Sequence, residues 1–409
     1  MTAKKQSSRL LALDVMRGIT IAGMLLVNNP GSWGALYTPL GHAAWNGLTP
    51  TDLVFPFFMF IMGVAMYMSM RKFEFKLTGN VAFKILRRTV VIFAIGLGLS
   101  WFGFFCRHIA AGDSFLTSIN NLETMRILGV MPRLALCYCA ASIAACLVPK
   151  KSFVKSLAWV AAGLIVTYSL ILIFGNGYEI AENNIIYRFD NAVLGSKHMY
   201  KGLAVWKALE NSAFDPEGLA STLPAIAHTI IGVLCGHLIV TIKDNDERVK
   251  NLFLIGAVLM MIGWLASYGL PINKNIWSPT FVLVTCGMCS TLLALLIWVI
   301  DIKGYKKWTM FFETFGINPL FLYVLGGALS ILFGCIKLPL GGVLSILFGR
   351  ITVPVGDDMV SIHNLIYKVF LLGITDDKYL ASCLYAIIFV TINWCVGYVL
   401  YKKKIYIKI

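Results

Sequence analysis

The sequence has few charged residues for its length. Only 13% of the 409 residues are Asp, Glu, Lys or Arg, whereas 58% are hydrophobic. One soluble core could not bury that much apolar surface, so the composition excludes a soluble globular protein. The chain has long apolar runs instead, which predict an integral membrane protein.

Acidic residues are scarce, with 20 Asp and Glu against 35 Lys and Arg, and the formal net charge is +15. In a soluble protein this excess would suggest nucleic-acid binding. Here the basic residues cluster where apolar runs end. We therefore interpret them as topology signals with membrane lipids as partners, and we predict no nucleic-acid binding.

The sequence also lacks a cysteine framework, internal repeats and linkers. Most of the ten cysteines lie within apolar runs, and the CGMC at 286–289 has no second cluster. These thiols are expected to act as small hydrophobic side chains, and no metal cofactor is predicted. Because no repeat, low-complexity segment or linker divides the chain, residues 1–409 are predicted to form a single transmembrane domain.

About ten apolar runs are long enough to cross about 30 Å of hydrocarbon as helices. The predicted spans are 17–35, 53–70, 85–105, 127–148, 156–174, 221–241, 251–269, 279–300, 309–330 and 380–401. The fold class is therefore an all-α, polytopic membrane helix bundle. The distribution of Lys and Arg among the loops places both termini in the cytoplasm. The first run has no small-residue cleavage site and is predicted to be a retained span.

Three segments are predicted to be extracytoplasmic, near residues 36–52, 175–220 and 331–378. The second is long and polar, which is typical of a functional or folded loop. The third must cross the membrane twice or not at all, because the last span returns to a basic C-terminus. We expect it to form amphipathic helices on or in the outer face.

Polar residues interrupt the apolar pattern between the first two spans. His42 lies in the turn and Asn28 in the outer half of the first span, while Asp52 precedes the second span. From the residues alone, His42 could be interfacial, Asn28 could bond a neighbouring helix, and Asp52 could cap a helix. Asp14 and Arg17 share one helix face at the opposite membrane surface, where a salt bridge with an anchoring role would suffice.

Several longer motifs run in order along nearly the whole chain. They are LDVMRG (13–18), LLVNNPG (25–31), HAAWNGLTPTDLVFPFFMFIMG (42–63), GVMPRLALCY (129–138), FDPEGLASTLPAIAHTIIG (214–232), LPINKNIWS (270–278) and FGINPLFLYV (315–324). With these motifs the chain resembles the heparan-alpha-glucosaminide N-acetyltransferase family. The resemblance implies a membrane enzyme that uses cytosolic acetyl-CoA to acetylate a glucosamine across the bilayer.

The chain lacks the lumenal N-terminal domain and extra span of the lysosomal members. It therefore looks like a bacterial relative, for which the inner membrane is the expected location.

The resemblance also implies site residues. His42 stands at the position of the catalytic histidine, with Asn28 beside it. His42 would act as a general base on the acceptor amine or as a nucleophile that carries the acetyl group, and both routes stay open. Asn28 would donate a hydrogen bond to the carbonyl oxygen, and Asp52 would orient His42 or cap the second span.

Donor binding requires cations at the inner face, because the nucleotide of acetyl-CoA cannot cross hydrocarbon unaided. Arg17, with its neighbour Asp14, and the pair Arg87 and Arg88 are the candidates. Arg133, predicted within a span, is expected to be paired or to line a wet cavity and joins this set.

The acceptor is expected to be an amino sugar or oligosaccharide that contacts aromatic, amide and carboxylate groups. The candidates are Trp45, Asn46, Glu217, Asn273, Asn275 and Trp277. A proton-coupled sugar transporter and an O-acetyltransferase of an envelope glycan are the alternatives to an N-acetyltransferase. The sequence leaves a homodimer open.

Overall fold

The structure, a computed structural model, describes residues 10–120, 123–207, 213–339 and 359–407. Among these residues, nine helices are long and apolar enough to cross a membrane, and a bent pair would make ten. The nine are α1 (Leu11–Asn28), α2 (Val54–Met70), α3 (Gly79–Ala111), α5 (Val130–Leu147), α6 (Phe153–Phe174), α8 (Thr222–Thr241), α9 (Asn245–Ala266), α10 (Pro279–Leu296) and α16 (Lys378–Lys402). The predicted fold class is confirmed.

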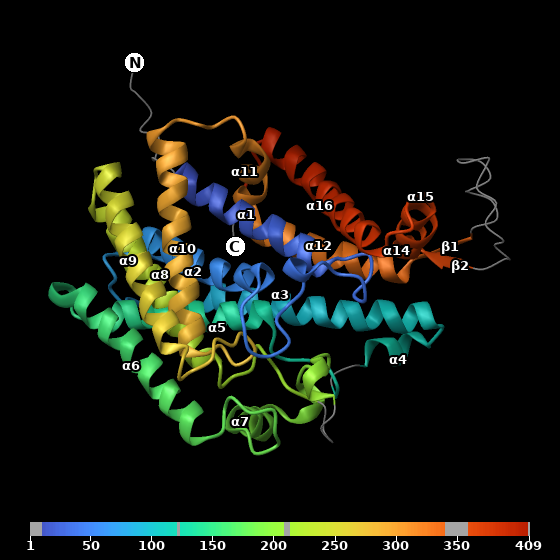
Figure 1. The fold of residues 1–409 in the computed structure, drawn as a ribbon, viewed down its shortest axis with the longest axis horizontal. Helices are drawn as coiled ribbons and strands as arrows, with labels where there is room; N and C mark the ends of the chain where they lie inside the picture. Colours follow the sequence, from blue (N-terminus) through green and yellow to red (C-terminus); the bar gives the residue numbers. More distant parts are fainter. Residues whose placement is uncertain (1–9, 121–122, 208–212, 340–358, 408–409) are drawn as a thin grey trace.

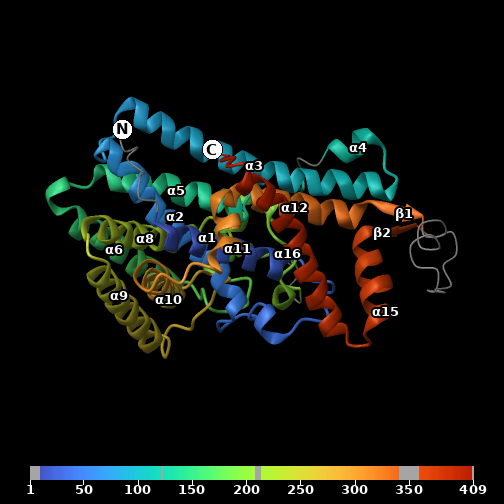
Figure 2. The same ribbon diagram turned by 90° about the horizontal axis from the view of Figure 1, so that it is seen from above.

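The helices divide into an inner and an outer group. In Figure 2, α3 and α9 lie on opposite sides of the bundle, with α1, α2 and α8 between them. Burial agrees, because 67% of the α8 span is buried inside the protein but only 17% of the α3 span is. The outer helices present apolar side chains to the surroundings, as helices in contact with lipid do.

Glycines allow the inner helices to pack closely. A Cβ atom at Gly63 of α2 would lie 2.2 Å from the carbonyl oxygen of Thr229, and one at Gly232 of α8 would lie 2.3 Å from that of Phe60. The two backbones are therefore in direct contact, which is how membrane helices associate without a hydrophobic driving force.

The two ends of the bundle differ in structure. In Figure 1 α11 (Thr309–Ile317) lies near the top and α7 (Ile185–Leu194) at the bottom. The other short elements are α4 (Phe115–Ile119), strands β1 (Lys337–Pro339) and β2 (Met359–Ser361), α14 (Ile362–Asn364), a π-helical turn (Leu365–Leu371) and α15 (Leu372–Ile374).

The first span differs from its prediction of 17–35, because α1 begins at Leu11 and ends at Asn28. The residue before a proline disfavours helical geometry, so Pro30 makes helix difficult at Asn29. Hydropathy alone did not predict that the helix ends here, because several of the residues that follow Pro30 are apolar.

The predicted span 309–330 is two helices, α11 (Thr309–Ile317) and α12 (Pro319–Cys335), bent by 86°. Asn318 occupies the break. Its side-chain amide donates to the carbonyl oxygen of Ile405 at 2.8 Å, and its oxygen accepts from the backbone N–H of Ile407 at 2.8 Å. Asn318, at the break, thus binds the segment 405–407 at the end of the described residues.

Two of the predicted extracytoplasmic segments contain folded structure. Residues 175–207 and 213–220 include α7 and pack around a separate apolar cluster that contains Trp45, Trp206 and Phe214. In the described part of 331–378, β1 and β2 pair antiparallel, and no helix after Cys335 reaches spanning length. The remainder, 340–358, lies outside the described residues.

Candidate active site

His42 and Asp52 form a pair in the loop before α2. The Nδ1 atom of His42 lies 2.7 Å from Oδ1 of Asp52. The other carboxylate oxygen, Oδ2, accepts from the backbone N–H groups of Ala43 at 3.2 Å and Thr49 at 3.0 Å. Asp52 therefore caps the start of the α2 span and contacts His42 at once, so the two roles considered for it are compatible.

This pair combines a fixed partner with an accessible ring. The Asp52 side chain is 1% exposed, whereas that of His42 is 44% exposed. Since a carboxylate only accepts hydrogen bonds, Nδ1 of His42 carries the proton and Nε2 keeps its lone pair. The accessible nitrogen is thus the one suited to act as base or nucleophile.

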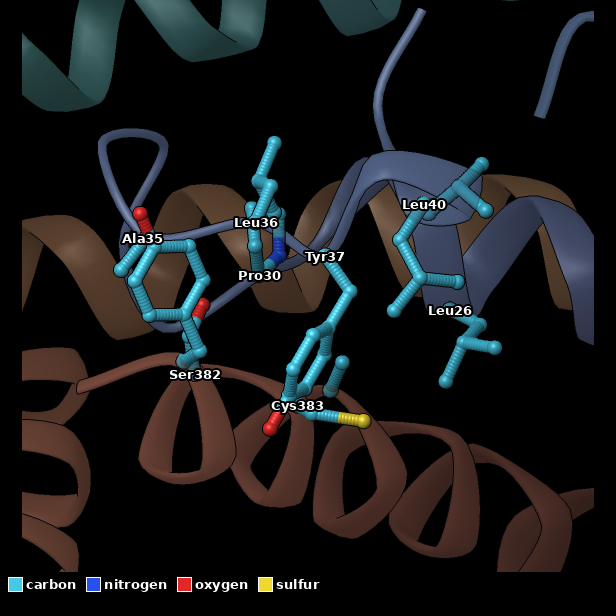
Figure 3. Close-up of a pocket in the computed structure, with 11 residues that line it drawn as sticks. Leu26, Pro30, Ala35, Leu36, Tyr37, Leu40, Ser382 and Cys383 are labelled. Atoms are coloured by element: carbon cyan, nitrogen blue, oxygen red, sulfur yellow. The ribbon is translucent and has the colours of Figure 1, made fainter. Parts of the chain in front are cut away.

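The loop that carries His42 is anchored to α16. The backbone N–H of Gly31 donates to the Ser382 carbonyl at 3.2 Å, and that of Ser32 donates to the Ser382 hydroxyl at 3.0 Å. Figure 3 shows Tyr37 against Cys383 in the small pocket between this loop and α16. Its volume of about 10 Å³ holds at most one water, so the contact is packing and not a ligand site.

Lys274 completes the cluster from the loop between α9 and α10. Its Nζ lies 3.0 Å from Nδ1 and 3.3 Å from Nε2 of His42, and 3.6 Å from Oδ1 of Asp52. Burial lowers the pKa of Lys274 from its ordinary value, while Asp52 and Glu217 act in the opposite direction. An ammonium thus lies directly beside the imidazole.

Hydrogen bonds join the loops of His42 and Lys274. The backbone N–H of Gly47 donates to the carbonyl of Ile272 at 2.8 Å, and the Asn273 amide donates to Oδ1 of Asn46 at 3.1 Å. Asn46 and Asn273, both predicted to bind the acceptor, therefore bond each other and fix the geometry of the two loops.

A second polar cluster lies next to Lys274. Arg126 donates to Asp215 at 2.9 Å and 2.5 Å and to Glu217 at 2.5 Å. Although burial raises the pKa of Glu217, Arg126 holds it below its ordinary value. Glu217 is therefore a carboxylate, and it is close enough to influence the Lys274 ammonium.

Arg133 supports the same loop from within the bundle. It is fully buried and donates to the Gly218 carbonyl at 2.8 Å and to the Ser221 hydroxyl. Its guanidinium lies over the Trp277 ring, 5.2 Å from the centroid. The structure thus places Arg133 beside the acceptor candidates, away from the donor candidates with which the sequence had grouped it.

The two tryptophans expected to stack on a sugar are buried. Trp45 is 7% exposed and donates to the Tyr178 carbonyl at 2.7 Å, while Trp277 is 1% exposed and packs edge-on against Phe55. Neither offers an open aromatic face, which differs from the prediction. Asn275 is also buried.

Asn28 ends α1 as an exposed residue. No hydrogen bond joins it to His42 within the described residues. Its neighbour Asn29 is buried and donates to the Leu25 carbonyl at 2.8 Å, so the helix end is closed by Asn29.

A cavity of about 370 Å³ runs along α2 towards the N-terminal end of α1. It is lined by Arg17, Phe58, Ile61, Met62, Ala65, Met66, Arg88, Ile92, Met131, Leu134, Tyr138, Pro319, Leu320 and Ile407. Two of the predicted donor residues, Arg17 and Arg88, are the cations in this lining. Its size falls in the usual range of ligand pockets.

The arginines are held in different ways. Arg17 donates to Asp14 at 2.9 Å and to the Gly316 carbonyl at 3.2 Å, whereas the Arg88 guanidinium lies 4.8 Å from the centre of the Tyr138 ring. Arg87 is exposed and does not line the cavity. Asp14 is therefore the partner of Arg17, and Arg88 is better placed than Arg87 to meet a ligand.

A larger groove of about 540 Å³ between α6, α8 and α9 has an apolar lining with only His237 and Thr241 as polar residues near one end. No Arg or Lys lines it, so it lacks the groups that a nucleotide requires. No cluster of three His, Cys, Asp or Glu that could hold a metal occurs in the described part of the chain.

The sequence predictions missed Lys274, Arg126 and Asp215. Lys274 lies within the quoted motif LPINKNIWS, but its contact with His42 joins positions 232 residues apart. The available signal was a lysine between two asparagines, away from the basic clusters that mark membrane exits.

No family model matches the chain. It is similar to the heparan-alpha-glucosaminide N-acetyltransferase of Mus musculus, with 26% identity over 373 residues, which cover 79% of this chain and 54% of the relative. The Homo sapiens protein of the same name is 27% identical over 367 residues, covering 77% and 52%. The chain thus spans about half the length of these curated relatives. The predicted relationship to them is confirmed.

Proposed function

We propose that the protein transfers the acetyl group of cytosolic acetyl-CoA to the amine of a glucosamine-type sugar on the extracytoplasmic side of a bacterial inner membrane. The observation that carries this proposal is the 2.7 Å contact between the exposed ring of His42 and the buried Asp52. The names of the two similar proteins, both N-acetyltransferases, support this reaction class.

The cavity would supply the inner part of a route for the donor. Phe58 and Met66, both in its lining, are about 12 Å apart along α2, and Phe58 is about 9 Å along the chain from Asp52. Arg17 and Arg88 would bind phosphate oxygens near the cytoplasmic end, where charge-assisted hydrogen bonds are strong. The pantetheine arm would then extend through the apolar part towards His42.

His42 supports two balanced routes. In direct transfer, the amine attacks the thioester carbon, Nε2 takes a proton from the amine, and the C–S bond breaks as the CoA thiolate leaves. In the covalent route, Nε2 itself attacks and releases the thiolate. The amine then displaces the imidazole from the acetyl group and loses its proton. The Nδ1 contact with Asp52 holds the required tautomer in both routes.

The acceptor would enter from the extracytoplasmic end, where the Glu217 carboxylate, held by Arg126, acts on the charge of Lys274. Asn28, which is exposed at the same end, stays a candidate for contact with the thioester carbonyl. Anionic lipid at the basic cytoplasmic loops and a homodimer also stay predictions.

The deciding experiment uses purified protein in detergent with no gradient. We expect acetyl-CoA-dependent formation of N-acetylglucosamine from glucosamine, detected by mass spectrometry. Uptake of sugar into vesicles without covalent modification would support a transporter instead. Acetylation of hydroxyl acceptors in preference to amines would support an O-acetyltransferase.

Sidedness can be tested by thiol labelling in a variant without native cysteines. We expect a cysteine at Ala44 to react with an impermeant reagent in intact cells, and one at Lys151 to react only after the membrane is opened. Both positions are exposed. The reverse pattern would invert the direction of transfer.

A further inference from the structure

Lys274 is the cation closest to the reactive nitrogen of His42. Its Nζ is 3.0 Å from Nδ1 and 3.3 Å from Nε2, so the ammonium lies over the imidazole ring, close to both nitrogens. A carbonyl group that reacts at Nε2 would therefore come within reach of the Lys274 ammonium.

Hydrogen bonds hold the turn that carries Lys274 before any substrate binds. Asn273 accepts from the Ile276 backbone N–H at 3.2 Å and donates its own backbone N–H to Ser278 at 3.0 Å. Tyr168 donates to the Ile276 carbonyl at 2.6 Å. The side chain of Lys274 is 15% exposed. A donor on a turn held this firmly needs little reorganisation during a reaction.

Charge around Lys274 favours its protonated form. Burial lowers the pKa of Lys274, and the charges of Asp52, with Oδ1 at 3.6 Å, and of Glu217 act against this. Both carboxylates have other partners, since Asp52 contacts His42 and Glu217 accepts from Arg126. The ammonium has hydrogen bonds to offer to a new acceptor.

We propose that Lys274 is the oxyanion donor of this site: its ammonium binds the thioester carbonyl oxygen as negative charge develops there. This inference rests on the proposed acetyl transfer. When the thioester enters, its carbonyl oxygen accepts a hydrogen bond from the Lys274 ammonium, while the Nε2 lone pair stays available for the reaction. Lys274 forms no covalent bond in this step. It has neither gained nor lost a proton once the C–S bond has broken.

A purely structural ion pair with Asp52 would have different consequences. It would make Lys274 matter for folding and loop position, but not for the charge on the carbonyl oxygen. A nucleophilic Lys274 would differ again, because it would carry the acetyl group as an amide. The substitutions below separate these three roles.

The first experiment compares Lys274→Met with the control Lys197→Met, which changes an exposed lysine of the same end. We expect kcat for glucosamine acetylation to fall on the order of 10² to 10³-fold in Lys274→Met, with binding of acetyl-CoA retained. The control should match the wild type. A Lys274→Met protein with near-normal kcat would overturn the inference.

The second experiment distinguishes loss of the ammonium group from loss of activity through misfolding. Methylammonium added to Lys274→Ala should restore the rate of N-acetylglucosamine formation at least about tenfold, scored by the sugar product because methylamine can itself accept acetyl. Lys274→Arg should keep part of the activity and shift its alkaline limit to higher pH, since guanidinium stays protonated. Absence of both effects would overturn the role.

Labelled acetyl-CoA adds a further check. Label retained on a peptide with Lys274 would overturn the inference in favour of a nucleophilic lysine. If the wild type forms no N-acetylglucosamine, the proposed function fails and the inference with it. If the wild type is active and Lys274→Met is equally active, only the inference fails.

Discussion

The His42 loop and the cavity along α2 use polar groups in opposite ways. In the loop, His42, Asp52 and Lys274 lie within hydrogen-bonding or ion-pair distance of one another, on segments tied by backbone hydrogen bonds. In the cavity, most lining residues are apolar or Met, with Arg17 and Arg88 as the cations. One region fixes a few atoms rigidly, and the other leaves room for a long, flexible ligand.

This difference separates two kinds of effect. Rigid polar clusters act on charge that develops during a reaction, so changes there should lower kcat. Cavity groups bind the ground state and the transition state alike, so changes there should raise KM for the donor. The predictions below test whether the two regions divide in this way.

His42→Ala should have the largest effect. Loss of the base or nucleophile should lower kcat on the order of 10² to 10⁴-fold, while acetyl-CoA binding stays near normal because the ring lies at the surface of the loop. Steady-state kinetics and equilibrium binding would measure both. His108→Ala, which changes a histidine paired with Asp113 away from the loop, serves as the control. A folded His42→Ala protein with normal turnover would remove this residue from the chemistry.

Asp52→Asn should lower kcat on the order of 10² to 10³-fold. The amide keeps an oxygen for the N–H groups of Ala43 and Thr49, but it no longer attracts the protonated Nδ1 of His42. Stability should change by only about 1 kcal/mol, as for a weakened cap. A rise in KM for acetyl-CoA with constant kcat would contradict the proposed division between the His42 loop and the cavity.

Arg88→Ala should act on the other region and raise KM for acetyl-CoA about tenfold, with kcat nearly unchanged. A lost hydrogen bond to a charged group costs about 1.5 kcal/mol or more. Arg87→Ala is a closely matched control, because the neighbouring arginine is exposed outside the cavity. Equal effects of the two substitutions would argue against donor binding in this cavity.

The smallest effect concerns stability and pH. Burial raises the pKa of Asp190, in α7, to about 7 from 3.8. Because the folded state holds this proton more tightly than the unfolded state, stability should fall as pH rises from about 4 to about 7 and then level off. The change should be at most a few kcal/mol. Asp190→Asn should flatten this profile in thermal unfolding, without a change in donor KM. An unchanged slope would exclude Asp190 as its source.

Hydropathy was sufficient for the helix bundle, because about twenty apolar residues in a row have few other solutions. It failed where a single residue decides, as at Pro30 after α1 and at Asn318 between α11 and α12. Hydropathy also cannot tell a buried aromatic from one that faces a ligand. Trp45 and Trp277 were expected at the sugar, and both are buried in packing contacts in the structure.

The site was predictable where its members are close in sequence. His42 and Asp52 are ten residues apart and could be paired from the motif. Lys274 and Arg126 reach the site through contacts between distant segments, for which no local period exists. The sequence marked Arg133 as an unusual residue within a span. Only its hydrogen bond to the Gly218 carbonyl showed at which end of the bundle its side chain lies.

The two hydrogen bonds of the Asn318 side chain have a practical consequence for handling the protein. Ile407 is both held by Asn318 and part of the cavity lining, so a change at this end of the described residues would alter the cavity wall. Purification tags therefore belong at the other terminus, or must be removed before donor affinity is measured. Proteolytic trimming back to Lys404 would take away Ile405 and Ile407 and open that wall to the surroundings.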